Sequence, residues 1–319
     1  MKGRLSCYTC LLVLTTLSIV SCSAQPETSQ DMSGTGVSMM AEPTMMKEED
    51  IAIEVKGSKD DSAMVDVSVV NNTTGTRTEF PPLTEIQLGR SGIFKYANGA
   101  LFAVHTSGDN AGDLSKGGWK DYLWRHETQG SGTKLLEGRG IQFVVSTDAR
   151  FILATSDDEV LIMRDGKVVI AKTKASFALT GGNTQFNLYP IAVGPKTSWL
   201  SFSTAENPVL QSLLRVDHTS GAIERVDIAN LNIRGAFDVE PERGRLLYAD
   251  RPYTQDAERN AELDKEPSAL WVFDTKTKKT EQVAKLAPGE QVAILFWEDE
   301  RNIFYRLMSE EKGRTVTVQ

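Results

Sequence analysis

The feature that most constrains the fold is a repeat of short apolar runs with a period of about 50 residues. Past residue 50, no long stretch has helical periodicity, and runs of Val, Ile, Leu, Phe, Tyr and Trp alternate with Gly, Asp, Asn and Ser. This pattern is typical of many short strands. A polar turn followed by an apolar strand recurs five times, at intervals of 50, 48, 47 and 57 residues when aligned on Leu101, Phe151, Trp199, Leu246 and Ile303. The sequence therefore predicts an all-β domain built from repeats.

A second hairpin lies between successive copies of the first. Each copy has an apolar start, a polar turn and a return strand, and the copies begin at Leu123, Leu161, Leu213 and Leu270. Three of the turns contain an Asp, at Asp165, Asp217 and Asp274. Asp favours turns because its side chain accepts hydrogen bonds from the following backbone. Together the two hairpins make a four-stranded unit, which has the length and content of a β-propeller blade.

Four units are complete in the sequence, over residues 94–136, 141–171, 189–228 and 235–283. A fifth starts at about residue 291 and lacks at least one strand. An incomplete blade leaves sheet edges exposed, which favours aggregation. Two apolar segments ahead of the repeats, 51–55 and 64–70, read as strands and could complete the last blade.

We therefore predict a propeller domain over residues 51–319 with about five four-stranded blades, whose ring is closed by the N-terminal strands. Six blades result if residues 51–90 form a blade with other strands. The alternative architecture is a β-sandwich at 51–90 beside an open propeller.

The repeat resembles that of the TolB-type propeller family. The family repeat combines an apolar residue, a Ser-Pro-Asp-Gly turn, a strand and a Leu-Tyr-Val-x-Asp strand, and the resemblance covers residues 94–307. No copy here keeps the full turn; Tyr96-Ala97-Asn98-Gly99 and Ser146-Thr147-Asp148-Ala149 come nearest. The resemblance implies a propeller fold and a role in protein interaction.

The N-terminus has the features of a bacterial lipoprotein signal peptide. Lys2 and Arg4 precede an apolar stretch that is shorter than the roughly 20 residues of a membrane-spanning helix. The stretch ends in Ile-Val-Ser followed by Cys22, which resembles a lipobox. We expect residues 1–21 to be removed, Cys22 to carry a diacylglycerol and the protein to lie at the cell envelope, anchored to the outer membrane or another extracytoplasmic membrane surface. The alternative is an ordinary signal peptide with an incidental cysteine.

Residues 22–50 have the composition of a flexible tether. They contain no aromatic residue and are rich in Ser, Thr, Gly, Pro and Glu, so they cannot bury enough apolar surface to fold alone. Four thioethers, at Met39, Met40, Met45 and Met46, are of a type that binds Cu(I). No His or Cys accompanies them, and we interpret the segment as solvated tether.

Charge excludes two partner classes. The chain has 35 basic and 43 acidic residues, and loss of Lys2 and Arg4 with the leader makes the mature domain more acidic still. Binding to nucleic acid or anionic lipid depends on a basic surface. We therefore expect no nucleic-acid partner and no membrane contact except through the lipid. All three cysteines lie at or before residue 22, so no disulfide is expected in the mature domain.

The sequence contains no recognisable catalytic motif. There is no Gly-x-Ser-x-Gly elbow, and the three histidines, His105, His126 and His218, are far apart in the chain. We interpret each histidine as a turn or packing residue, because zinc ligands usually occur in closely spaced pairs. The acidic clusters 109–113 and 157–159 could hold calcium, but neither has the spacing of a calcium-binding loop. We predict no catalytic residue, no metal site and no cofactor beyond the lipid at Cys22.

Two long loops are the candidates for partner binding. They run over residues 107–121 and 250–268, each between the two hairpins of a blade, and the blade-to-blade loop 181–185 is expected on the same face. Long connections are often functional, and aromatic residues and Arg dominate binding hot spots. The candidates are Trp119, Arg251, Tyr253 and Arg259.

The function predicted from these observations is a protein-binding or scaffold module that holds a protein or peptide by its loop face. The alternative is a propeller enzyme, glycan-active or quinone-dependent, with its site in the central funnel. A third hypothesis is a purely structural envelope lipoprotein.

Overall fold

The fold is described from a computed structural model, which describes residues 51–57, 64–87, 92–108, 117–177, 186–204, 212–226, 237–250, 262, 265–310 and 312–318. The leader, Cys22 and the tether lie outside these residues. The described elements are strands together with one short 3-10 helix, η3 (Lys174–Phe177). No helix in this part of the chain has the length and apolar character needed to cross a membrane.

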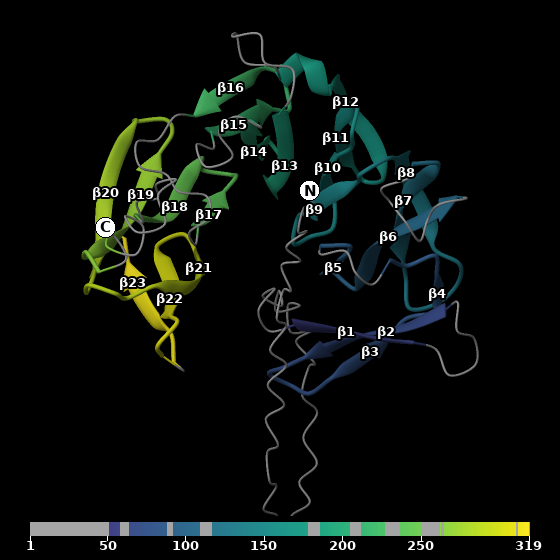
Figure 1. Ribbon diagram of the computed structural model, residues 1–319, viewed down its shortest axis with the longest axis horizontal. Helices are drawn as coiled ribbons and strands as arrows, with labels where there is room; N and C mark the ends of the chain where they lie inside the picture. Colours follow the sequence, from purple (N-terminus) through teal and green to yellow (C-terminus); the bar gives the residue numbers. More distant parts are fainter. Residues whose placement is uncertain are drawn as a thin grey trace, which may run out of the picture. The chain divides into compact units, whose positions relative to one another are not determined.

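The repeats form five successive antiparallel sheets, labelled in Figure 1. Blade 1 contains β5 (Phe94–Ala97), β6 (Ala100–Gly108), β7 (Trp119–His126) and β8 (Thr133–Gly138). Blade 2 contains β9 (Gln142–Val145), β10 (Phe151–Thr155), β11 (Glu159–Arg164) and β12 (Lys167–Thr173). Blade 3 contains β13 (Phe186–Val193), β14 (Thr197–Thr204), β15 (Ser212–Asp217) and β16 (Ile223–Val226). Blade 4 contains β17 (Phe237–Glu240), β18 (Arg245–Asp250), β19 (Ser268–Asp274) and β20 (Lys279–Leu286). Blade 5 contains β21 (Val292–Trp297), β22 (Asn302–Leu307) and β23 (Arg314–Thr317). The predicted all-β propeller architecture is confirmed, because each sheet is a meander of the kind that forms a blade.

Local turn chemistry fixes where the strands reverse. Asp217 Oδ1 accepts hydrogen bonds from the backbone N–H groups of Thr219 and Ser220 at 3.0 and 2.8 Å, and Asp274 makes the same kind of turn. Asp165 and Gly166 have φ angles of 50° and 76°, as in the two-residue hairpin turn that matches the strand twist. The turn role predicted for these aspartates is confirmed.

Both faces of the central strands are buried in blades 1 to 4, which explains the continuous apolar runs in the sequence. In β18, Leu246 packs with blade 3 residues, whereas the next residue, Leu247, packs with blade 5 residues. In β6, Phe102 and Val104 face blade 2. Successive side chains on a strand point to opposite faces, so one strand serves two cores. The blades are therefore joined by a series of face-to-face apolar clusters.

The N-terminal strands form a sheet of their own, which corrects the prediction that they complete the last blade and agrees with the six-blade alternative. This N-terminal sheet contains β1 (Ile51–Gly57), β2 (Met64–Asn71), β3 (Arg77–Glu79) and β4 (Leu83–Thr84). One edge of β2 pairs with β1 and the other with β3 and β4, so β2 has no edge free for the last blade. Blade 5 has three strands within the described residues. The structure thus has six sheets, and residues 51–84 form the sixth.

The N-terminal sheet packs on blade 1. Val65, Val67 and Val69 of β2 form a buried cluster with Leu101 and Ala103 of β6. These two residues alternate along β6 with those that face blade 2, so β6 is covered on both sides. The seam between the N-terminal sheet and blade 1 is therefore a continuation of the blade-to-blade packing.

Hydrogen bonds also link the first turns of neighbouring blades. The Asn98 side chain donates to the carbonyl of Asp148 at 3.3 Å, from blade 1 to blade 2. Thr197 Oγ1 donates to the carbonyl of Pro241 at 2.6 Å, from blade 3 to blade 4. Arg245 donates to the carbonyl of Glu300 at 2.6 Å, from blade 4 to blade 5. These bonds fix blades 1, 3 and 4 to the blade that follows, at the end where the first two strands meet.

Candidate functional site

The predicted loop residue Trp119 lies at the root of its loop. It is the first residue of β7 and is 9% exposed, and the guanidinium carbon of Arg139 lies 4.9 Å from its ring centre. An Arg over an indole face is a favourable cation–π contact. Trp119 is therefore placed to anchor the loop, with its ring covered by Arg139. Arg251, Tyr253 and Arg259 lie outside the described residues, and their role stays a prediction.

The root of the first long loop has little freedom. Gly108, the last residue of β6, is the register partner of Trp119. It has a φ of +119°, and a Cβ at this position would lie 2.4 Å from the carbonyl oxygen of Gly118. Only glycine fits this backbone conformation and this close approach. The loop thus leaves and re-enters the blade through one closely packed point.

A buried carboxylate supports the same root. Asp121, two residues beyond Trp119, is 0% exposed and accepts a hydrogen bond from Thr106 Oγ1 at 2.7 Å. Its second oxygen accepts the backbone N–H of Ile141, ahead of blade 2, at 2.9 Å. Sequence analysis did not single out Asp121, because nothing in its immediate surroundings distinguishes it from a solvated loop carboxylate.

Of the two acidic clusters considered for calcium, the structure describes only the one at residues 157–159. The cluster 109–113 lies outside the described residues. Asp157, in the other cluster, lies 3.7 Å from the guanidinium of Arg139. Within the described ranges, no three or more His, Cys, Asp or Glu side chains gather in a way that could hold a metal ion.

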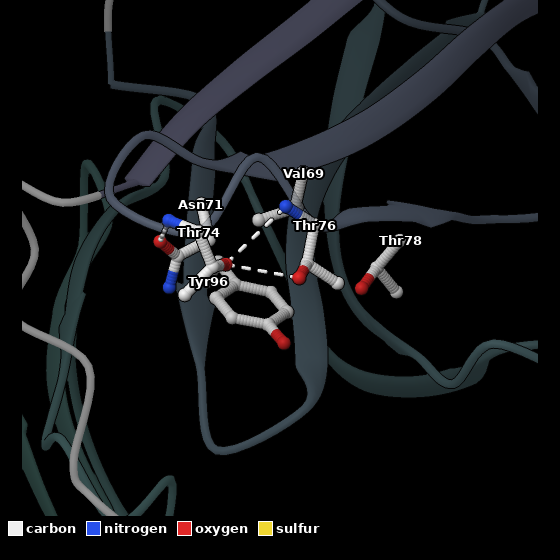
Figure 2. Close-up of a pocket in the computed structure, with 6 residues that line it drawn as sticks. All are labelled: Val69, Asn71, Thr74, Thr76, Thr78 and Tyr96. Carbon is white, nitrogen blue, oxygen red and sulfur yellow. Dashed lines mark hydrogen bonds between the residues drawn. The ribbon is translucent and has the colours of Figure 1, made fainter. Parts of the chain in front are cut away.

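A small pocket lies beside the seam between the N-terminal sheet and blade 1 (Figure 2). Its volume is about 150 Å³, and its lining has no charged group: Val69, Asn71, Thr74, Thr76, Thr78 and Tyr96. Thr74 Oγ1 donates to Thr76 Oγ1 at 2.9 Å and accepts from the Thr76 backbone at 3.3 Å, as the dashed lines of Figure 2 show. The Tyr96 ring lies against Phe80 edge-on, with centres 6.2 Å apart. The pocket has room for a small neutral polar group, and no titratable acid–base pair lines it.

Two of the three histidines meet in the interior of blade 1. His105 on β6 and His126 on β7 are each 6% exposed, and their Nε2 atoms lie 3.0 Å apart. The Trp124 ring lies beside both, with its centre 5.6 Å from that of His105 and 6.1 Å from that of His126. Burial lowers the pKa of His105 to about 4, with a further lowering from His126, and burial also lowers the pKa of His126. Both rings are therefore neutral at pH 7.

The pairing was missed because the two residues are 21 positions apart in sequence. The hairpin register opposes His105 to Tyr122 and Leu101 to His126, which puts both imidazoles on one face of the sheet. Period-two alternation within each strand, combined with the hairpin turn, was the signal that could have found it.

The third histidine has a local structural role. His218 Nε2 lies 2.7 Å from Ser198 Oγ, and its Nδ1 lies 3.2 Å from the carbonyl oxygen of Pro195. Burial lowers its pKa. The interpretation of His218 as a turn residue agrees with these contacts.

Comparison with known sequences identifies no relative. No family model matches the chain, and no curated protein sequence matches it.

Comparison with solved structures finds β-propellers. The chain is similar to the β-propeller domain of the Trilobed protease from Pyrococcus furiosus, with a TM-score of 0.48 at 11% identity over 84% of this chain and 79% of that one. It is also similar to a prolyl endopeptidase, with a TM-score of 0.49 at 13% identity over 86% of this chain and 43% of that one. An acylaminoacyl peptidase from Pyrococcus horikoshii gives a TM-score of 0.48 at 12% identity over 84% of this chain and 44% of that one.

The chain thus spans less than half the length of these last two peptidases. All three TM-scores are below 0.5, so the architecture rests on the strand pairing described above, and no activity is carried over from these proteins.

Proposed function

We propose that the chain is a lipid-anchored envelope protein of the TolB-type propeller class, whose propeller binds a protein or peptide through two long loops. The loops are residues 109–118 in blade 1 and 251–267 in blade 4. The proposed anchor is a diacylglycerol on Cys22, and residues 23–50 are the proposed tether between the membrane and the first strand.

The observation that carries this proposal is the rigid root of the blade 1 loop. Gly108 and Trp119 are paired across β6 and β7, Arg139 covers Trp119, and the buried Asp121 fixes the following strand to blade 2. A loop on a fixed base loses less conformational freedom on binding than a loop on a mobile one, which favours affinity.

The blade 4 loop has the same position in its blade. Asp250, at the end of β18, precedes the loop, and Asp250 pairs with Ala269 at the start of β19. Both long loops therefore join the second and third strands of their blades. Equivalent connections emerge at the same end of every blade, so the loops of blades 1 and 4 are suited to act on one partner.

The test of partner binding is a pull-down from detergent-solubilised envelope. The bait is the intact protein or a variant in which residues 251–267 are replaced by a short Gly-Ser linker. A matched control carries Thr128→Ala, Gln129→Ala and Ser131→Ala in the β7–β8 turn, at the opposite end of blade 1. We expect a partner that the intact protein and the control retain and the loop variant loses. Equal recovery with all three baits would overturn the loop-face assignment, and no partner with any bait would overturn the binding function.

The anchor is tested separately by cell fractionation. Cys22→Ala should move the protein from the membrane fraction to the soluble fraction, because the thiol is the site of lipid attachment. Cys7→Ala is the control, since it changes a cysteine within the leader and leaves the lipobox intact. Membrane retention of the Cys22→Ala protein would refute the lipoprotein assignment without bearing on the loops.

A further inference from the structure

The buried histidine pair of blade 1 offers two neutral nitrogen ligands that face each other. The Nε2 atoms of His105 and His126 are 3.0 Å apart, while the ring centres are 5.2 Å apart and the ring planes differ by 29°. For two imidazoles whose Nε2 atoms are 3.0 Å apart, a distance of 5.2 Å between the ring centres is close to the largest possible. The rings therefore lie nearly end to end, and the two nitrogens point straight at each other.

A backbone hydrogen bond orients His105, and a glycine lies beside His126. His105 donates a hydrogen bond to the backbone carbonyl of Thr84, and because its Nε2 faces His126, the donating nitrogen is Nδ1. This tautomer leaves a lone pair on Nε2, which is the arrangement found in metal-bound histidines. Gly132 in the β7–β8 turn leaves space for the other ring, since a Cβ at this position would lie 2.4 Å from His126 Nδ1.

We propose that His105 and His126, together with the Trp124 ring, bind a soft monovalent cation, Cu(I) or its close analogue Ag(I). Two neutral nitrogen ligands placed end to end suit the linear coordination of these ions. A buried divalent ion would need further ligands and would carry a larger desolvation penalty, because the cost of burying an ion rises with its charge. Imidazole is a good ligand for copper.

Trp124 adds a third favourable contact. Its ring centre is 5.6 and 6.1 Å from the two imidazole centres, so an ion between the imidazoles lies within about 6 Å of the indole, the range of a cation–π interaction. An indole ring is electron-rich and carries no proton that must leave on binding.

Ion entry requires only a small movement. A metal–nitrogen bond is about 2 Å long, so a linear unit needs the two nitrogens about 4 Å apart, roughly 1 Å more than their present separation. In the proposed complex a rotation of the His126 side chain supplies this distance, and the glycine at position 132 leaves space beside the ring. The ion takes the place of the hydrogen bond between the rings, and the proton on His126 Nε2 moves to its Nδ1, so no net proton is released.

The test is Ag(I) and Cu(I) affinity, measured by competition with a chromophoric chelator under reducing conditions for Cu(I). The protein is the full chain with Cys7, Cys10 and Cys22 changed to Ser and the five tether methionines, Met32, Met39, Met40, Met45 and Met46, changed to Leu, so that these soft ligands do not compete. We expect one ion per chain, with affinity weakened at least about 100-fold by His105→Asn or His126→Asn and several-fold by Trp124→Phe. His218→Asn is the matched control and should leave the affinity unchanged.

A measurement on the unsubstituted site guards against unfolded variants. In histidine-ring nitrogen spectra, Ag(I) should shift the Nε2 resonances of His105 and His126 and leave those of His218 in place. Absence of binding, equal binding by the His→Asn variants, or a shift confined to His218 would each overturn the proposal.

Discussion

The carboxylate of Asp121 holds the backbone N–H of Ile141 at 2.9 Å, and this contact ties the third strand of blade 1 to the chain entering blade 2. Blade 4 has a comparable tie, in which Asp238 accepts the backbone N–H of Trp297 on blade 5 at 3.0 Å. A carboxylate suits this role because each of its oxygens can serve a donor in a different blade.

Asp121→Asn should destabilise the domain. The amide nitrogen cannot accept a hydrogen bond, so either Thr106 or Ile141 loses its acceptor at a site that is 0% exposed. We expect a loss of about 1–3 kcal/mol in the free energy of unfolding, measured by urea denaturation at pH 7. Glu137→Gln, an exposed partner of Lys120 and Lys134, is the control and should cost much less, because exposed ion pairs contribute little to stability. Equal costs for the two variants would show that Asp121 is not a tie between blades.

Stability should fall as the pH drops from about 6.5 to about 4. The pKa of His105 is about 4 in the folded chain against 6.5 when unperturbed, so in this window the unfolded chain binds more protons than the folded one. For His105 the resulting contribution to the free energy of unfolding is at most about 3 kcal/mol. It is present in full above pH 7 and is lost as the pH falls from about 6.5 to about 4. Urea denaturation at several pH values measures it.

Two variants test the source of this pH dependence. One is the double variant His105→Gln/His126→Gln, and the other is the control His218→Gln. The double variant should show a weaker dependence between pH 6.5 and 4.5, and His218→Gln should keep most of it. The same slope in the double variant and the unsubstituted chain would exclude the histidine pair as its cause.

Gly108→Ala should disturb the root of the blade 1 loop. The alanine methyl meets the Gly118 carbonyl, and a φ of +119° is strained for any residue with a side chain. We expect a loss of about 2–4 kcal/mol in thermal or urea unfolding. Gly57→Ala, where a Cβ meets nothing within 4 Å, is the matched control and should be nearly neutral. An unchanged Gly108→Ala protein would mean that the root relaxes freely.

Val67→Ala should show that the N-terminal sheet is part of the folded domain. Val67 is 2% exposed and packs in the cluster that contains Leu101 and Ala103, so its truncation leaves a cavity. We expect a loss of about 1–2.5 kcal/mol in a single unfolding transition. Val168→Ala, at a position 48% exposed on β12, should cost far less. Separate transitions, with only the smaller one shifted by Val67→Ala, would make residues 51–84 an independent appendage.

The sequence predicted the blades well because each blade is a local unit. The unit predicted at 141–171 corresponds to strands that run from Gln142 to Thr173, and the unit at 235–283 to strands from Phe237 to Leu286. Strand order within a meander follows chain order, so turn residues and apolar runs are enough to place it.

Long-range pairing was harder to predict. The strands β1 and β2 were found, but their partners β3 and β4 are only 3 and 2 residues long and lie next to Pro81 and Pro82, where strand signals are weak. These two strands were therefore assigned to the last blade, whereas they form a sheet with β3 and β4, as in the six-blade alternative. The meeting of His105 with His126 and the burial of Asp121 likewise depend on register across a hairpin and on the neighbouring blade. No local pattern indicates the burial of Asp121, whereas strand alternation together with the hairpin turn carries a signal for the histidine pair.

The register of β1 on β2 decides how the domain responds to a pull on its N-terminal side. Ile51 lies opposite Asn71, so the first residue of β1 and the last residue of β2 sit at the same end of the ladder. Tension applied ahead of Ile51 and resisted by the chain after Asn71 separates the two strands from this end, so that their hydrogen bonds break one after another. If the strands were pulled along their length in opposite directions, all these hydrogen bonds would have to break together. We therefore expect β1 to detach from β2 at a lower force than is needed to unfold the five blades.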